Sequence, residues 1–280
     1  MIKLGCCLPG GNFLPDTAEN APGYEALQII AKCRYILGCG FDFTEFNATG
    51  LCQLSDEDFQ ILVEENKKQP LKLQALNGMF SAAFHLADPS NQWDEIVSYI
   101  HKLIDRMAML SIPYVVFGSG KARAIPDTMQ KQDALDNIHR MMHAFADYAE
   151  PKGITLVLEP LRKQESNVYN LVSDSGKDVY AVNRKAIRLL ADSYHMVYED
   201  TPAEIVEDFP DILRHCHIAE GPDRTPPGIF TTGDPDYNKR FANSLKKIGY
   251  TEGVSIECGF SDFKTEAPKA LSYMRSIFAE

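Results

Sequence analysis

Strand-like and helix-like segments alternate eight times along this chain, and the alternation restricts its fold more than any other feature. Each strand-like segment is short and apolar, and turn-forming or polar residues follow it. Strands that alternate with helices form a parallel sheet, and eight such units favour closure into a (β/α)8 barrel. The predicted strands cover residues 2–8, 41–46, 71–76, 113–117, 154–159, 186–191, 212–216 and 253–256. The predicted helices cover residues 24–37, 55–66, 93–108, 135–149, 177–182, 202–209, 241–248 and 267–277.

The open alternative to a barrel is a doubly wound sheet, and the chain lacks the motifs that would support it. Neither a G-x-G-x-x-G fingerprint nor a phosphate-binding P-loop occurs in the sequence. The length of 280 residues fits one barrel, and no shift of composition divides the chain. We therefore expect an α/β protein with a single (β/α)8 barrel domain over residues 1–280.

Charge and cysteine content argue against several classes of partner. The formal net charge of −11 disfavours a nucleic-acid partner held by a basic surface. The seven cysteines form no C-x-x-C pair, which is typical of a reduced intracellular protein. No apolar run reaches membrane-spanning length, and the first four residues lead directly into a strand without a signal peptide. We expect a cytoplasmic protein that binds neither nucleic acid nor membrane. Apolar loop residues such as Phe230 and Phe260 would permit a homo-oligomer, a dimer or a tetramer.

Each of the last four predicted strands delivers a polar side chain at its carboxyl end. These residues are Glu159, Asp192, His217 and Glu257. An apolar strand that ends in a charge is unfavourable unless a metal or substrate receives that charge. In a barrel, the carboxyl ends of all strands meet on one face, so these residues would converge although they lie far apart in sequence. Alternation along the strands directs Glu159, His217 and Glu257 inward, with His215 one layer deeper.

Three carboxylates and one imidazole are a suitable ligand set for a single divalent ion. The mixture of oxygen and nitrogen ligands favours Mn²⁺, then Mg²⁺ or Co²⁺, and permits Zn²⁺. The alternative is that each residue is an isolated polar group at a solvated strand end. Four such residues on consecutive strands favour the metal site.

Further polar residues follow the same strand ends. His195 lies one turn after Asp192, where it would face the open positions of the ion without binding it. Arg224 lies in the loop after His217, and a guanidinium there would hold a substrate oxygen. Glu165, in the polar loop after strand five, would contact the substrate. The segment 118–123 either cradles an anion with backbone N–H groups and its arginine or forms only a tight turn.

Four motifs at these strand ends resemble the xylose-isomerase-like barrel superfamily. The motifs are Leu158-Glu159-Pro160-Leu161, Asp192-Ser193-Tyr194-His195, His217-Ile218-Ala219-Glu220 with Arg224, and Ile256-Glu257-Cys258. Within this superfamily the pattern is most similar to ketose 3-epimerases, such as tagatose and psicose 3-epimerases, and to sugar phosphate isomerases. The resemblance implies four metal ligands, Glu159, Asp192, His217 and Glu257. It also implies three substrate contacts, His195, Arg224 and Glu165.

Two departures from the superfamily patterns argue against two of its branches. True xylose isomerases carry a lysine two residues after the glutamate of strand five, where this chain has Leu161. The endonuclease IV branch has additional histidine ligands after strands two to four and an Asp-x-His after strand seven. The corresponding segments 77–80, 117–120 and 223–226 contain no histidine, so a trinuclear DNA-repair site is poorly supported.

These observations predict a divalent-metal-dependent sugar isomerase or epimerase, similar to a ketose 3-epimerase. It would act by proton transfer through a metal-stabilised enediolate. Glu159 and Glu257 would serve as the catalytic acid and base on the two faces of the substrate carbon. We expect an unphosphorylated small-molecule sugar, because the acidic net charge disfavours dianions. The alternatives are a metal-dependent dehydratase of a keto-polyol on the same site, a barrel that binds without turnover and, with less support, an endonuclease IV-like hydrolase.

Overall fold

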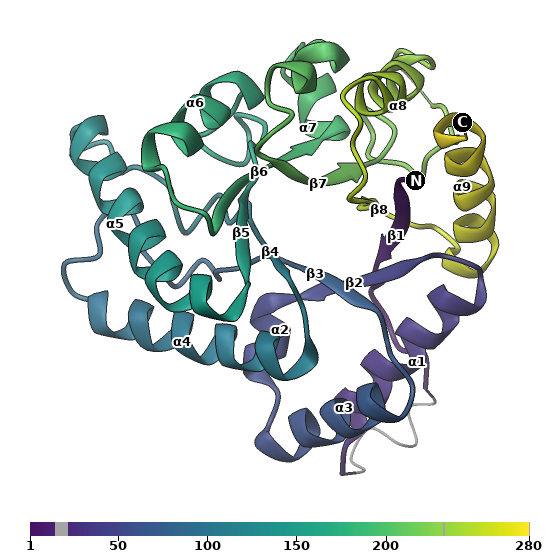
Figure 1. The fold of residues 1–280 in the computed structure, drawn as a ribbon, viewed down its shortest axis with the longest axis horizontal. Coiled ribbons are helices and arrows are strands. Elements are labelled where there is room, and N and C mark those ends of the chain that lie inside the picture. The colour runs from purple at the N-terminus through teal and green to yellow at the C-terminus, as the bar shows by residue number, and fades with distance from the viewer. Residues whose placement is uncertain (15–21, 232, 280) are drawn as a thin grey trace.

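Eight parallel strands form a closed barrel in the computed structural model, which describes residues 1–14, 22–231 and 233–279 (Figure 1). Each strand pairs with the next along the chain, and β8 pairs with β1 to close the barrel. The strands are β1 (Lys3–Cys7), β2 (Phe43–Asn47), β3 (Leu73–Asn77), β4 (Tyr114–Phe117), β5 (Thr155–Leu158), β6 (Ile187–Asp192), β7 (Leu213–Ile218) and β8 (Gly253–Ile256). The predicted (β/α)8 barrel is confirmed.

Helices surround the barrel, as Figure 1 shows. They are α1 (Tyr24–Gly38), α2 (Ala48–Gln53), α3 (Asp56–Lys68), α4 (Trp93–Leu110), α5 (Lys131–Ala149), α6 (Val172–Val182), α7 (Ser193–Tyr198), α8 (Tyr237–Lys247) and α9 (Phe263–Phe278), with 3₁₀ segments η2 (Glu150–Lys152) and η3 (Ala203–Asp208). Several elements differ from the sequence prediction. Helix α2 was not predicted, and the predicted helix over 202–209 is the 3₁₀ segment η3. Helix α6 begins five residues earlier than expected, and α5, α8 and α9 each begin four residues earlier.

Local sequence signals explain the two clearest helices. In α4, buried residues including Ile96, Ile100 and Leu103 follow the helical period and face the barrel. Helix α3 begins at the cap residue Ser55, whose Oγ accepts a hydrogen bond from the backbone N–H of Asp58 at 3.0 Å. Both helices therefore form where the sequence predicts them.

The barrel interior is filled by side chains below the carboxyl ends of the strands. Val116, Val157 and Leu190 form a buried cluster separate from the main core between strands and helices. The ring of Phe43 also occupies this interior, because β1 and β8 carry glycine beside it. A Cβ atom on Gly5 would lie 2.1 Å from that ring, and one on Gly253 would lie 2.8 Å from it. The interior is thus a packed layer on which polar strand ends rest.

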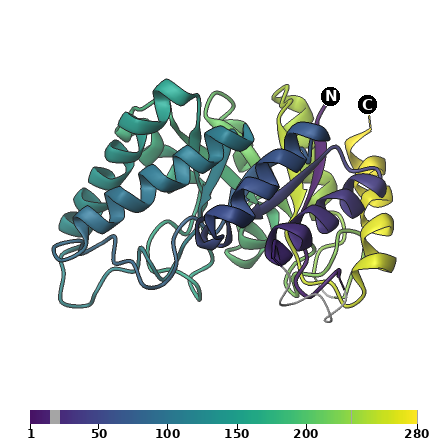
Figure 2. The same ribbon diagram turned by 90° about the horizontal axis from the view of Figure 1, so that it is seen from below.

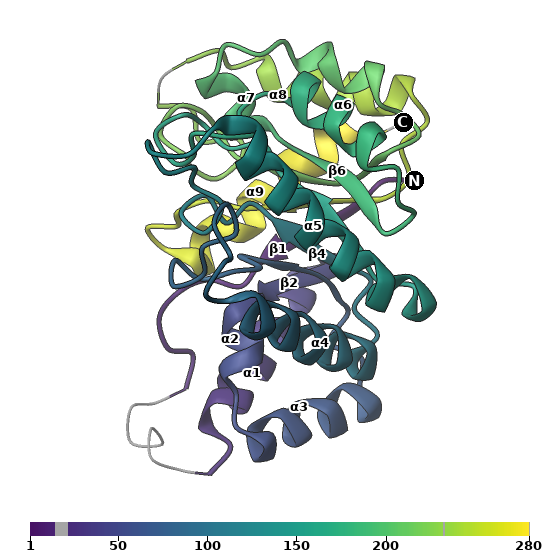
Figure 3. The ribbon, with the colours of Figure 1, turned by 90° about the vertical axis from the view of Figure 1, so that its left-hand side faces the viewer.

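The connections that follow the strands collect on one side of the barrel, opposite the side where both termini lie (Figures 2 and 3). This side corresponds to the carboxyl ends of the strands, where (β/α)8 barrels build their sites. Within the described residues, no helix combines the length and the apolarity needed to cross a bilayer.

Candidate active site

Four polar side chains from the last four strands converge at the carboxyl end of the barrel. Glu159 follows β5, Asp192 ends β6, His217 lies in β7 and Glu257 follows β8. One ligand atom from each lies within 4.8 Å of those of the other three. The structure therefore brings together all four residues that the sequence singled out as metal ligands, and we call them the four-residue cluster.

His217 lies at the centre of the four-residue cluster and is fully buried. Its Nδ1 atom lies 3.1 Å from Oε1 of Glu159 and 3.0 Å from Oε2 of Glu257. The two carboxylate oxygens of Asp192 have different contacts. Its Oδ1 accepts a hydrogen bond from the backbone N–H of Tyr194 at 2.9 Å and so caps α7, while Oδ2 faces the cluster.

Arg224 closes one side of the cluster. Its Nη2 donates to Oε2 of Glu257 at 2.6 Å and to Oδ2 of Asp192 at 3.2 Å, and its Nε donates to the Glu257 carbonyl at 3.0 Å. The backbone of Arg224 is left-handed, with φ 52°, in a loop that the antiparallel bridge between Glu220 and Thr225 holds together. Non-glycine residues rarely adopt this conformation, and such positions cluster at functional sites.

Burial and neighbouring charges shift the ionisation of the cluster. Burial raises the pKa of Asp192 to about 7, against the opposing effect of Arg224. Burial also raises the pKa of Glu159. Burial alone would raise the pKa of Glu257, but His217 and Arg224 together lower it to about 2. Carboxylates with raised pKa values in a buried site lack sufficient positive charge nearby.

The cluster fits a divalent cation by ligand type and by charge. Three carboxylates and an imidazole are the oxygen and nitrogen donors that Mn²⁺, Mg²⁺, Co²⁺ and Zn²⁺ accept. The three carboxylates exceed the single Arg224 guanidinium by two negative charges, and a divalent ion would offset this excess. Buried charges that lack a counter-charge are costly, so a cation would stabilise this arrangement.

The three predicted substrate contacts line one cavity beside the cluster. Glu165, His195 and Arg224 share a cavity of about 470 Å³ with Glu159 and Glu257. Burial, with a smaller contribution from Arg224, lowers the pKa of His195 to about 3, so its imidazole is neutral near pH 7. The Nδ1 atom of His195 accepts from the backbone N–H of Arg162 at 3.3 Å. With Nδ1 as acceptor, Nε2 carries the hydrogen; it lies 3.6 Å from Oδ2 of Asp192 and 3.5 Å from Nη1 of Arg224.

The segment 118–123 does not bind an anion through Arg123. This guanidinium is fully buried and donates to the carbonyls of Phe117 at 2.8 Å and Glu159 at 2.9 Å, so it ties the ends of β4 and β5 together. The glycines permit close approach instead. A Cβ atom on Gly118 would lie 2.3 Å from Oε2 of Glu159, and one on Gly120 would lie 2.2 Å from a backbone carbonyl. The turn interpretation is therefore the appropriate one.

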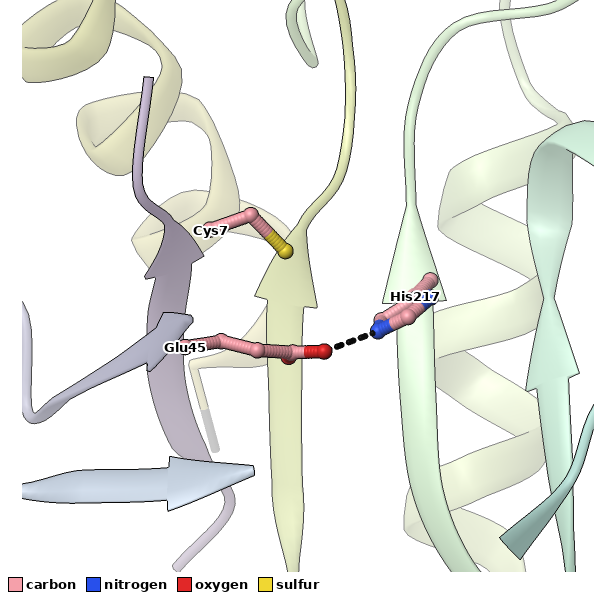
Figure 4. Close-up of side chains that lie close together, drawn as sticks. All are labelled: Cys7, Glu45 and His217. Carbon is pink, nitrogen blue, oxygen red and sulfur yellow. Dashed lines mark hydrogen bonds and ion pairs between the residues drawn. The ribbon is translucent and has the colours of Figure 1, made fainter. Parts of the chain in front are cut away.

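Sequence reasoning missed Glu45, a fully buried carboxylate in β2 that contacts His217 (Figure 4). It also missed Asn77 at the end of β3, whose Nδ2 donates to Oε1 of Glu257 at 3.1 Å. The sequence did contain a signal for Glu45. Phe43 and Glu45 lie two residues apart in an apolar strand and therefore point to the same face. A charge on the inner face of a strand was the very feature that identified the other four residues.

A second, larger cavity of about 650 Å³ lies on the other side of the barrel mouth. It is lined by the ends of β1 to β3 and by α1, including Asn47 and Lys32. Glu45 and Asn77 belong to its wall and also contact the four-residue cluster. The two cavities thus flank the cluster.

A closed barrel with three carboxylates and an imidazole at the carboxyl ends of its strands defines a barrel protein with a candidate metal centre. Residues 33–277 match the xylose isomerase-like TIM barrel family, and the chain belongs to this family.

The chain is similar to several epimerases. It is 34% identical over 117 residues to an L-ribulose 3-epimerase of Methylomonas sp. (strain DH-1), a match that covers 41% of this chain and 39% of the relative. It is 28% identical over 134 residues to a 3-dehydro-D-guloside 4-epimerase of Escherichia coli (strain K12), which covers 46% of this chain and 49% of the relative. These matches span less than half the length of either relative.

The fold is also similar to that of solved structures. The apo form of a 3-keto-D-glucoside 4-epimerase from E. coli superimposes with a TM-score of 0.78, covering 99% of this chain and 100% of that chain. The two sequences are 21% identical, so this likeness concerns the fold.

Proposed function

We propose that this protein is a sugar epimerase or isomerase that depends on one divalent metal ion and resembles a ketose 3-epimerase. The observation that carries the proposal is the convergence of Glu159, Asp192, His217 and Glu257 within 4.8 Å beside a cavity. Family membership and the similarity to named epimerases support the same reaction class. We infer Mn²⁺ as the first candidate for the ion.

The metal centre would be held by all four residues of the cluster. A divalent ion bound there supplies Lewis-acid chemistry, because it polarises carbonyl and hydroxyl oxygens of a substrate. Glu159 and Glu257 approach the centre from two different strand ends, those of β5 and β8, and both contact Nδ1 of His217. Each can therefore bind with one oxygen and leave the other for proton transfer.

Epimerisation beside a ketone moves one proton from the substrate to the enzyme and one proton back. One glutamate takes the proton from the carbon next to the carbonyl, and the C–H electron pair enters the conjugated system of the carbonyl. The other glutamate, protonated beforehand, delivers its proton to the opposite face of that carbon. Solvent exchange returns the pair to its first protonation state. This two-base scheme requires acid–base groups on both faces of the carbon, a role that Glu159 and Glu257 would fill.

His195, Arg224 and Glu165 would position the sugar. The Nε2–H of His195 lies beside Asp192 and Arg224, and Arg224 lies within hydrogen-bond reach of two carboxylates of the cluster. Their donors would hold the carbonyl and hydroxyl oxygens of the substrate, and Glu165 would accept from a hydroxyl group. Within the described lining of this cavity, Arg224 is the one positively charged side chain, and its guanidinium is already paired. This favours a neutral, unphosphorylated sugar.

A keto-sugar that carries a second group is another candidate substrate. The observation that favours it is the cavity of about 650 Å³ on the β1–β3 side of the cluster, which would receive an additional sugar ring or aglycone. One of the similar proteins is named a 3-dehydro-D-guloside 4-epimerase. Its reaction also inverts a carbon, and the proton-transfer scheme given above applies to any carbon beside a ketone.

Product analysis in deuterated water tests the proposed function. The metal-loaded protein is incubated with a panel of ketopentoses, ketohexoses and 3-keto-glycosides, and the products are identified by NMR and mass spectrometry. Incorporation of deuterium at the carbon beside the carbonyl, without loss of water from the sugar, supports an epimerase or isomerase. Loss of water identifies a dehydratase instead. Unchanged substrates across the panel, with metal bound, would contradict the proposal.

A further inference from the structure

The fully buried carboxylate of Glu45 contacts one member of the four-residue cluster, His217. Oε1 of Glu45, on β2, lies 3.0 Å from Nε2 of His217, on β7 (Figure 4). Oε2 of Glu45 lies 2.9 Å from Nε2 of His215 and 2.6 Å from Oγ of Ser255. We call Glu45, His215, His217 and Ser255 the Glu45 network.

The donors and acceptors in the Glu45 network assign the hydrogens. An ionised carboxylate can only accept, so the hydrogens must come from its three partners. His217 therefore carries a hydrogen on Nε2, and its Nδ1 points at Glu159 and Glu257. Without an ion, Nδ1 faces the carboxylates of Glu159 and Glu257 just as Nε2 faces that of Glu45 at 3.0 Å, so both nitrogens would carry hydrogens. A divalent ion among the cluster carboxylates would replace the hydrogen on Nδ1, because the hydrogen on Nε2 is retained by the buried Glu45 carboxylate.

His215 supports the same assignment. Its Nδ1 is buried, and within the described residues this atom has no hydrogen-bond partner. A hydrogen on Nδ1 would be an unsatisfied buried donor, so the hydrogen belongs on Nε2, where it points at Glu45. The ring is held between Phe43, with centroids 6.0 Å apart, and Tyr114, with centroids 6.2 Å apart. Glu45 is thus fixed by partners on two other strands.

A second metal site is the competing interpretation. Cys7, Glu45 and His217 place one potential ligand atom each within 4.8 Å of one another (Figure 4). Both oxygens of Glu45 already accept hydrogen bonds from three donors, and binding an ion there would break at least the bond to His217. These hydrogen bonds therefore favour a role for Glu45 in orienting His217 over a role as a metal ligand.

We infer that Glu45 is a positioning residue of the metal centre: it fixes His217 in the Nε2-protonated tautomer and thereby presents Nδ1 to a divalent cation. The inference rests on the proposed metal-dependent function. Histidine ligands commonly donate their other N–H to a carboxylate, and loss of that partner typically weakens metal affinity about 10–100-fold. Glu45 acts through His217 and does not itself bind the metal.

The first test is Glu45→Gln, which has the same shape but replaces an acceptor by an NH₂ donor. We expect the dissociation constant for Mn²⁺, measured by titration with EPR detection of the free ion, to rise about 10–100-fold. Ser255→Ala is the matched control, because it removes another hydrogen bond to Glu45 and leaves the contact with His217 in place. Its dissociation constant should change less than about threefold, since the His217 contact persists.

The second test reads the tautomer directly and needs no substitution. The ¹⁵N spectrum of histidine-labelled, Zn²⁺-loaded wild-type protein should show His217 with a protonated Nε2 and a metal-bound Nδ1. Assignment uses His217→Asn, which removes that signal. A metal-bound Nε2 in the wild-type protein would overturn the inference, and this readout holds even if Glu45→Gln fails to fold.

The number of metal ions bound per chain distinguishes a positioning role of Glu45 from a second metal site. Two ions bound per wild-type chain and one per Glu45→Gln chain would make Glu45 a ligand and overturn the inference. Unchanged Mn²⁺ affinity in Glu45→Gln would do the same. Neither measurement uses a sugar, so both test the inference without the proposed epimerase activity. If only the proposed activity is wrong, the protein will bind metal with the expected tautomer and will not turn over the ketose panel.

Discussion

Oε2 of Glu257 accepts a hydrogen bond from Nη2 of Arg224 at 2.6 Å and also lies 3.0 Å from Nδ1 of His217. One carboxylate oxygen is therefore shared between a predicted metal ligand and a predicted substrate contact. A guanidinium that pairs with a ligand carboxylate can direct its remaining N–H groups at a substrate oxygen. The backbone of Arg224 is left-handed at this position, with φ 52°.

Arg224→Ala should weaken substrate binding and leave the metal bound. Loss of a charged hydrogen bond is worth roughly 1.5–3 kcal/mol, so kcat/KM should fall about 10–150-fold, mainly through KM. Steady-state kinetics and Mn²⁺ titration check this. Arg240→Ala is the control, since Arg240 also pairs with two carboxylates but lies on the surface. A loss of metal binding in Arg224→Ala would contradict the assigned role.

Glu159→Gln and Glu257→Gln should separate metal binding from proton transfer. An amide oxygen still binds a metal weakly but cannot carry the proton. Excess metal should therefore restore occupancy while turnover stays about 10²–10⁴-fold lower. In at least one variant, exchange of the α-proton with solvent should persist for one epimer only, as measured by NMR in deuterated water. Full rescue by metal, or equal loss of exchange from both epimers in both variants, would point to a base elsewhere.

Gly118→Ala should displace Glu159. The new Cβ atom would lie 2.3 Å from Oε2 of Glu159, so the carboxylate must move away from the cluster. We expect Mn²⁺ affinity to fall by about tenfold or more, as for other losses of ligand orientation. Gly38→Ala is the matched control, because a Cβ atom there meets nothing within 4 Å. Equal affinity in the two variants would show that Glu159 does not bind the metal from its present position.

Chelation should lower stability as well as activity. A ligand that binds only the folded state stabilises it by about 2.7 kcal/mol at a hundredfold excess over its dissociation constant. The melting temperature should therefore rise with added Mn²⁺ and fall with EDTA. Asp192→Asn and His217→Ala should each reduce this rise strongly, because they remove ligands. A wild-type protein that keeps full activity in EDTA and contains no metal would refute the metal-dependent proposal.

A histidine outside the site gives a pH-dependent prediction. The Asp178 carboxylate, 2.7 Å from Nε2 of His139, raises the pKa of that imidazole above its usual value. A raised pKa in the folded state contributes stability that is complete below the unfolded pKa, about 6.5, and is lost as pH rises through the folded pKa. The difference in free energy of unfolding between wild type and His139→Gln should therefore be larger at pH 5.5 than at pH 8.5. Urea titrations, with metal content held constant, measure it; a difference that is independent of pH would contradict the assignment.

Arg123 and Glu45 show where reasoning from sequence reaches its limit. A glycine-rich loop that ends in arginine has the local pattern of an anion site, yet Arg123 binds the carbonyls of Phe117 and Glu159. Buried carbonyls need donors, and only the folded chain shows which ones are buried. Glu45 lies in a strand that the sequence predicts, but its partner His217 is 172 residues away.

Local periodicity and strand-end polarity, properties of the sequence alone, determined the eight strand–helix units and the barrel that they close. They also placed Glu159, Asp192, His217 and Glu257 on one face, because parallel strands in a barrel share the direction of their carboxyl ends. The short helix α2 depends on tertiary structure, because its six residues carry little helical signal beyond the Asn47 cap and it packs against α4. Tertiary structure also decided which buried groups share hydrogen bonds: Arg224 with Glu257, and Glu45 with His217. Those pairings depend on distances of a few ångströms across the barrel, which strand patterns do not encode.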